Sequence, residues 1–91
     1  MTPRKVDVNQ PEIVDNLRRL GYSVAVTSDL GKGFPDIIAG KHGRNWLFEI
    51  KNPEYDCKLT EAEEQFHAKW RGQIDVIRSA AEALEIMAGT A

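Results

Sequence analysis

Two short apolar stretches joined by a glycine-containing turn constrain the fold of this chain more than any other feature. The stretches are PDIIAG at residues 35–40 and NWLFEIK at residues 45–51, and the turn between them is GKHGR. Strand-length runs separated by such a loop predict a β-hairpin. Because alternate side chains of a strand share a face, Glu49 and Lys51 should project together, away from the apolar side chains at 46, 48 and 50.

The segments around the hairpin complete an α/β pattern. Asn9 or Gln10 can cap a first helix, and Thr60 with Glu63 forms the capping-box pattern that opens a second one. A hairpin followed by a strand–helix–strand crossover predicts a four-stranded mixed sheet flanked by helices, in the order α-β-β-β-α-β-α. The predicted elements are a helix within 9–21, a strand at 22–29, the two hairpin strands, a helix from 60 to about 71, a strand at 73–78 and a helix from 79 onward.

Length, composition and charge limit the classes of function. The chain has 91 residues, enough for one modest core, so residues 1–91 are predicted to form a single domain. Its formal net charge of −2 argues against a protein that coats nucleic acid, but it permits a small site whose acids bind a cation. No apolar run predicts a membrane span or a signal peptide, and the single Cys57 favours a reducing, cytoplasmic setting.

The polar residues of the hairpin predict a metal site. Antiparallel pairing brings Asp36 toward residues 49–51, where cross-strand Cβ atoms are about 5 Å apart. Two carboxylates at that distance repel unless a proton or a cation separates them, and oxygen donors of this kind suit Mg²⁺. We therefore predict that Asp36 and Glu49 bind Mg²⁺, with the backbone carbonyl of Ile50 as a further ligand. Lys51 would orient the attacking water or stabilise charge on the phosphoryl oxygens. The alternative is an exposed Glu49–Lys51 ion pair that contributes under about 1 kcal/mol.

These residues resemble a known nuclease signature. GFPDIIAG followed by NWLFEIK is similar to the PD-(D/E)XK motif, with Pro35-Asp36 and then Glu49-Ile50-Lys51. NQPEIVDNLRRLGYSV, KLT and FHAKWRGQIDVIRSAAEAL resemble, more narrowly, the VRR-NUC family and its small stand-alone phage and prophage members, over about residues 7–87. The resemblance implies a restriction-endonuclease-like fold and a Mg²⁺-dependent DNA endonuclease in which Mn²⁺ can substitute. It also implies a homodimer that cuts branched DNA such as four-way junctions, in the cytoplasm of a bacterial host if a phage encodes it.

The resemblance further implies roles for individual residues. Asp36 and Glu49 correspond to the metal-binding acids, and Lys51 corresponds to the catalytic lysine. Glu12 resembles an extra acid that relatives supply to the metal, often through water; the alternative is an acid that interacts favourably with the start of its own helix. Gln10 matches a recurring polar position and is a candidate DNA contact, with helix capping as the alternative.

The second helix departs from the family pattern. Relatives often have glutamine at the position of Glu63, so a glutamine contact with the site or the DNA would be missing unless Gln65 substitutes for it. Trp70 shares a helical stripe with Phe66 and is predicted to lie in the core. The basic residues of the loops and turns around the hairpin are candidate phosphate contacts: Lys32, Lys41, Arg44 and Lys58.

A second class of function uses the same fold without catalysis. A silent module that binds DNA or another protein would fit the acidic isoelectric point and the glutamate at position 63. The intact set of Asp36, Glu49 and Lys51 favours the enzyme.

Overall fold

The computed structural model describes residues 9–52, 54 and 58–89, and its elements follow the predicted order. Cys57 lies outside the described residues. Within these ranges no helix has the length and apolar character needed to cross a bilayer. The elements are α1 (Gln10–Arg19), β1 (Ser23–Val26), β2 (Ile37–Lys41), β3 (Arg44–Ile50), α2 (Glu61–Lys69), β4 (Asp75–Ile77) and α3 (Ala80–Ala88).

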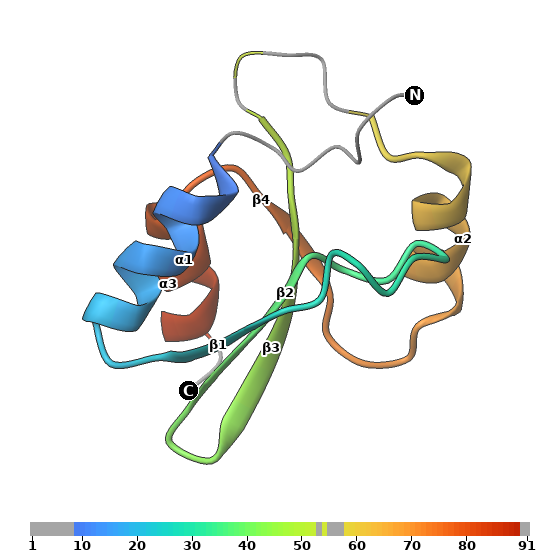
Figure 1. The fold of residues 1–91 in the computed structure, drawn as a ribbon. Coiled ribbons are helices and arrows are strands. Elements are labelled where there is room, and N and C mark those ends of the chain that lie inside the picture. The colour runs from blue at the N-terminus through green and yellow to red at the C-terminus, as the bar shows by residue number, and fades with distance from the viewer. Residues whose placement is uncertain (1–8, 53, 55–57, 90–91) are drawn as a thin grey trace.

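The strands form one mixed sheet of four in the order β1-β2-β3-β4 (Figure 1). β2 pairs antiparallel with β1 and with β3, and β3 pairs parallel with β4, so the predicted hairpin and the predicted crossover are both confirmed. The hairpin register joins Ile37 to Phe48. The last residues of β3 therefore extend past the start of β2, alongside the segment that leads into it.

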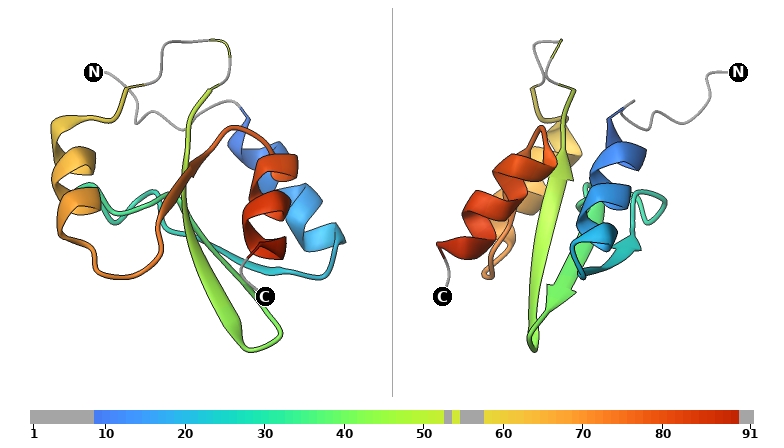
Figure 2. Two further views of the ribbon diagram at one scale, coloured as in Figure 1. Left: turned by 180° about the vertical axis from the view of Figure 1, so that it is seen from behind. Right: turned by 90° about the vertical axis from the view of Figure 1, so that its left-hand side faces the viewer.

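The core lies on one face of this sheet. Figure 1 shows α1 and α3 together on one side and α2 on the other, and the view from behind in Figure 2 shows the same separation. Trp46, Phe48 and Ile50 alternate along β3 and are buried, as predicted, which leaves the opposite face of the strand to Glu49 and Lys51. The buried apolar cluster comprises Ile13, Val14, Leu17, Ile37, Ala39, Trp46, Phe48, Ile50, Ile77, Ala83 and Met87.

Two strands are shorter than the sequence predicts. β1 ends at Val26 because a turn follows, closed by a hydrogen bond from the Leu30 amide to the Thr27 carbonyl at 3.0 Å. Thr27 itself still contacts the segment before β2: its amide donates to the Asp36 carbonyl and its hydroxyl to the Pro35 carbonyl, both at 2.7 Å. β4 begins only at Asp75, because before it the side chain of Gln73, and not the backbone, makes the hydrogen bonds to β3. That side chain accepts from the Leu47 amide at 2.7 Å and donates to the Leu47 carbonyl at 2.9 Å.

Helix α2 packs against a loop instead of the main core. None of its residues is buried, and the Phe34 ring meets the Phe66 ring edge-on at 5.3 Å between centroids. The prediction that Trp70 belongs to the core is wrong: its residue surface is 42% exposed. Trp70 follows the last turn of α2 and stacks on Phe66 at 5.2 Å, so the helical stripe faces a local aromatic cluster at the edge of the domain.

Candidate active site

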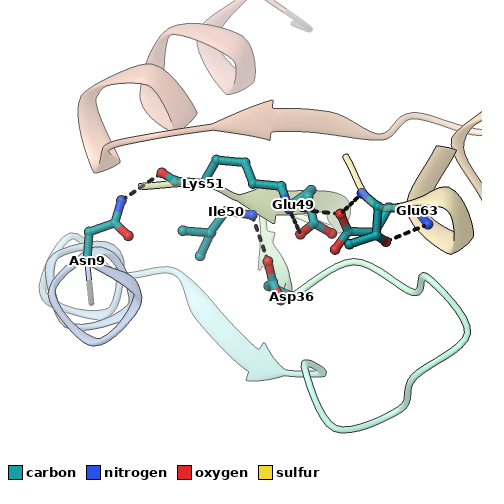
Figure 3. A network of polar contacts seen from close by, with 7 residues as sticks. Asn9, Asp36, Glu49, Ile50, Lys51 and Glu63 are labelled. Atoms are coloured by element: carbon teal, nitrogen blue, oxygen red, sulfur yellow. Dashed lines mark hydrogen bonds and ion pairs between the residues drawn. The ribbon is translucent and has the colours of Figure 1, made fainter. Parts of the chain in front are cut away.

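Asp36 lies immediately before β2 and is held against β3 by two hydrogen bonds. Its amide donates to the Phe48 carbonyl at 3.0 Å, and its Oδ2 accepts from the Ile50 amide at 2.8 Å (Figure 3). Glu49 lies between these two residues of β3. The structure thus brings Asp36 and Glu49 together, as the hairpin predicts.

Glu49 is a buried carboxyl group. Its residue surface is only 2% exposed, and Oε1 is buried without a hydrogen-bond partner among the described residues. Burial, followed by the neighbouring Asp36 and Glu63 carboxylates, raises the pKa of Glu49 to about 10. The alternative of an exposed Glu49–Lys51 ion pair is therefore wrong, because a side chain this buried is not part of a solvated surface ladder.

Lys51 joins this acid to helix α2. Its Nζ lies 2.8 Å from Glu63 Oε1 and 3.5 Å from Glu49 Oε2 (Figure 3). Burial by itself acts to lower the pKa of Lys51. The hydrogen bond with Glu63 and the charge of Glu49 outweigh this effect, so the net result is a raised pKa. Burial likewise acts to raise the pKa of Glu63, and the hydrogen bonds from Lys51 and from the Thr60 amide reverse this effect and lower it.

Glu63 is the site residue that the sequence analysis missed. The predicted capping box is confirmed: the Glu63 amide donates to Thr60 Oγ1 at 3.2 Å, and the Thr60 amide donates to Glu63 Oε1 at 2.9 Å. The same Oε1 also accepts from Lys51. The resemblance implies a glutamine at this position. The glutamate present here caps α2 and also binds the candidate catalytic lysine.

The oxygen atoms at the end of β3 fit a hard divalent cation. The Glu49 carboxyl lies beside the Asp36 carboxylate, and a cation bound between them would offset both the burial and the neighbouring negative charge that raise the pKa of Glu49. The Ile50 amide faces Asp36, so the Ile50 carbonyl lies on the same edge of the strand. Among the described residues, no three His, Cys, Asp or Glu side chains form a group that could hold a metal. Mg²⁺ is typically bound by one or two carboxylates, with water and phosphate oxygen atoms as its other ligands, and the two carboxylates and the carbonyl here fit this pattern.

Asn9, and not Glu12, is the α1 residue tied to this end of β3. Its Nδ2 donates to the Lys51 carbonyl at 3.0 Å and to the Arg78 carbonyl at 2.9 Å, so it clamps the ends of β3 and β4 together. Its side chain makes no helix cap, and within the described part of the chain its Oδ1 is buried without a hydrogen-bond partner. Glu12 is exposed and lines a hollow with Asn9, Asn16 and Arg78.

The structure separates the candidate DNA contacts. Gln10 is 5% exposed and donates to Ser28 Oγ at 3.4 Å, so its side chain is not on the surface. Lys41 and Arg44 flank the hairpin turn, at the opposite end of β3 from Glu49. Lys41 donates to the Leu20 carbonyl at 2.8 Å and covers the Tyr22 ring. Lys32 and Lys58 remain near the site end, in the loop before Asp36 and just before α2 respectively; Lys58 is exposed.

Comparison with known proteins adds no relative. A scan against models of protein families matches none to this chain, and searches of curated proteins and of solved structures return no match. The resemblance to the VRR-NUC family stays a prediction from the sequence motif.

Proposed function

We propose that this protein is a Mg²⁺-dependent DNA endonuclease of the VRR-NUC type. The observation that carries the proposal is the buried Glu49 carboxyl beside Asp36, with the Lys51 ammonium 3.5 Å away. Burying an acid beside a second acid destabilises a fold, and a cation bound between the two carboxyl groups would compensate for this cost. The order of elements supports the same reading, because the resemblance implies this α-β-β-β-α-β arrangement.

The chain's own residues divide the chemistry among them. Asp36, Glu49 and the Ile50 carbonyl would hold the metal, which supplies a Lewis acid for the scissile phosphate and lowers the pKa of a nearby water. Lys51 donates hydrogen bonds to the water or to the phosphoryl oxygens on which negative charge develops. Glu63 keeps Lys51 protonated and oriented through the 2.8 Å contact. Asn9 fixes the Lys51 backbone from the other side.

The proposed substrate and assembly rest on the family resemblance. It implies a homodimer that acts on branched DNA in the cytoplasm, and we extend the proposal to these features. A small domain of 91 residues has a limited surface for binding a duplex, and cutting both strands takes two active sites, so a dimer fits the proposed reaction.

A DNA panel tests the proposal. Linear, flapped and four-way DNA are incubated with Mg²⁺, with Mn²⁺ and with EDTA, using wild type, Asp36→Asn and Lys51→Ala. We expect metal-dependent cutting by the wild type and a loss of at least about 100-fold in each variant. Glu64→Gln, which removes an exposed acid of α2, is the matched control and should cut normally.

The outcomes separate the two classes of function. Cutting that persists in both variants would indicate a contaminating nuclease. Binding of DNA without cutting under either metal would favour the silent module.

A further inference from the structure

A hollow beside helix α2 is unused by the chemistry described above. Its volume is about 410 Å³, which is within the range of roughly 300–1,000 Å³ typical of ligand sites. It is lined by Lys32, Ala62, Gln65, Phe66, Lys69 and Trp70.

An aromatic row forms one wall of this hollow. Trp70 stacks on Phe66 with 18° between the ring planes, and Phe34 supports Phe66 edge-on at 72°. Trp70 is 42% exposed, so part of the indole remains accessible to a ligand. Gly72 makes room for this indole, since a Cβ at that position would lie 3.0 Å from Trp70 Nε1. The ring is therefore held in place while it stays accessible.

Two lysines give the hollow a positive rim in a chain of net charge −2. Lys69 is exposed on the last turn of α2. Lys32 has φ of 57°, a left-handed conformation that glycine adopts more easily, and it lies between Gly31 and Gly33, which also have positive φ.

The hollow is rigidly connected to the candidate active site. Gly33 packs so closely on α2 that an added Cβ would lie 2.2 Å from the Ala62 carbonyl oxygen. Asp36 follows three residues after Gly33, and Glu63 follows Ala62 on the helix. A ligand seated in the hollow would thus be positioned relative to both the metal-binding acid and the partner of Lys51.

We propose that this hollow binds an unpaired nucleobase of the DNA substrate, which stacks on Trp70 while Lys32 and Lys69 contact the adjoining phosphates. Flat aromatic surfaces next to cations are the features that recognise single-stranded nucleotides without sequence preference. The Gln65 amide, at the wall, can hydrogen-bond the edge of the base. The proposal rests on the proposed nuclease function, and it explains a preference for branched or frayed DNA over a continuous duplex.

Fluorescence of a single-stranded oligonucleotide carrying one 2-aminopurine tests this site in EDTA, where no cutting occurs. We expect wild type to quench the probe, and Trp70→Ala to abolish quenching and raise the Kd by roughly 5- to 150-fold, the range for one stacked base. Trp70→Phe keeps an aromatic face and should bind nearly as wild type. Lys69→Ala should lower the slope of log Kd against log salt by about 0.7. Leu20→Ala, an exposed apolar residue elsewhere, is the control and should bind normally.

Failure of this inference differs from failure of the nuclease. Metal-dependent cutting by the wild type without quenching would overturn the nucleobase site and leave the enzyme. Quenching that Trp70→Ala abolishes, in a protein that never cuts, would support the site and overturn the enzyme. An equal loss of affinity in Trp70→Ala for blunt duplex and for single strand would overturn the site, because a stacking pocket distinguishes the two.

Discussion

The ammonium of Lys51 lies 2.8 Å from Oε1 of Glu63, so the candidate catalytic lysine, which directly follows β3, is bound to the first turn of α2. The same carboxylate oxygen accepts from the Thr60 amide at 2.9 Å. One side chain therefore links the start of a helix to the charge state of the site.

Replacing Glu63 by Gln tests this link. The amide oxygen can still accept from Thr60, so we expect the unfolding free energy to change by less than about 1 kcal/mol. The pKa of Lys51 should fall, because the hydrogen bond and charge of Glu63 help to raise it. The alkaline limb of the cleavage rate against pH should therefore move to lower pH. Glu64→Gln is the matched control, and an unmoved limb in Glu63→Gln would show that Glu63 does not set the protonation of Lys51.

The buried acid predicts how stability depends on pH in the absence of metal. The pKa of Glu49 is 4.5 when unperturbed and about 10 in the fold, so between these values the folded protein holds a proton that the unfolded chain releases. The contribution of Glu49 to stability is thus complete below pH 4.5 and is lost as pH rises toward 10, by at most about 1.4 kcal/mol per pH unit.

Glu49→Gln should therefore flatten the pH dependence and raise the stability at pH 8. Urea unfolding in EDTA at pH 5, 6, 7 and 8 measures both effects, with Glu64→Gln as the variant that should follow the wild type. Parallel curves for Glu49→Gln and wild type would mean that Glu49 is already ionised in the fold.

The positions of Asp36, Glu49 and Glu12 predict which of these acids control metal binding. We expect Mg²⁺ and Mn²⁺ to raise the melting temperature of the wild type but not of Asp36→Asn or Glu49→Gln. Glu12→Gln should keep the shift, because Glu12 is exposed, unlike the buried Glu49, and lines a hollow with Asn9, Asn16 and Arg78. Thermal scans at several metal concentrations measure this. A shift lost in Glu12→Gln would support the role in metal binding that the family resemblance implies.

The sequence predicts the parts of this site that depend on short-range geometry. Strand periodicity separates Glu49 and Lys51 from Phe48 and Ile50, and the length of the hairpin turn brings Asp36 to Glu49. Both follow from local rules of strands and turns. The capping box of Thr60 and Glu63 is local as well, and it too is confirmed.

The missed features depend on how distant segments dock. The contact of Glu63 with Lys51 depends on where α2 settles, and the clamp of Asn9 on the carbonyls of Lys51 and Arg78 joins residues far apart in the chain. Trp70 has the spacing of a core residue, yet its helix faces a loop. Helical periodicity predicts which side of a helix is apolar but not which surface it meets.

Two glycines of the loop before Asp36 provide a matched test of how α2 is docked. Gly31 and Gly33 have similar positive φ, 72° and 79°, but a Cβ at 31 would have no atom of the described residues within 4 Å, whereas one at 33 would lie 2.2 Å from the Ala62 carbonyl oxygen. Gly31→Ala should cost only the left-handed conformation, about 1–2 kcal/mol. Gly33→Ala carries the same cost and also forces α2 away from the loop, so it should lose more stability and, by separating Glu63 from Lys51, much of the cleavage activity. Urea unfolding and cleavage rates of both variants measure the difference, and equal effects would mean that α2 is not held by this contact.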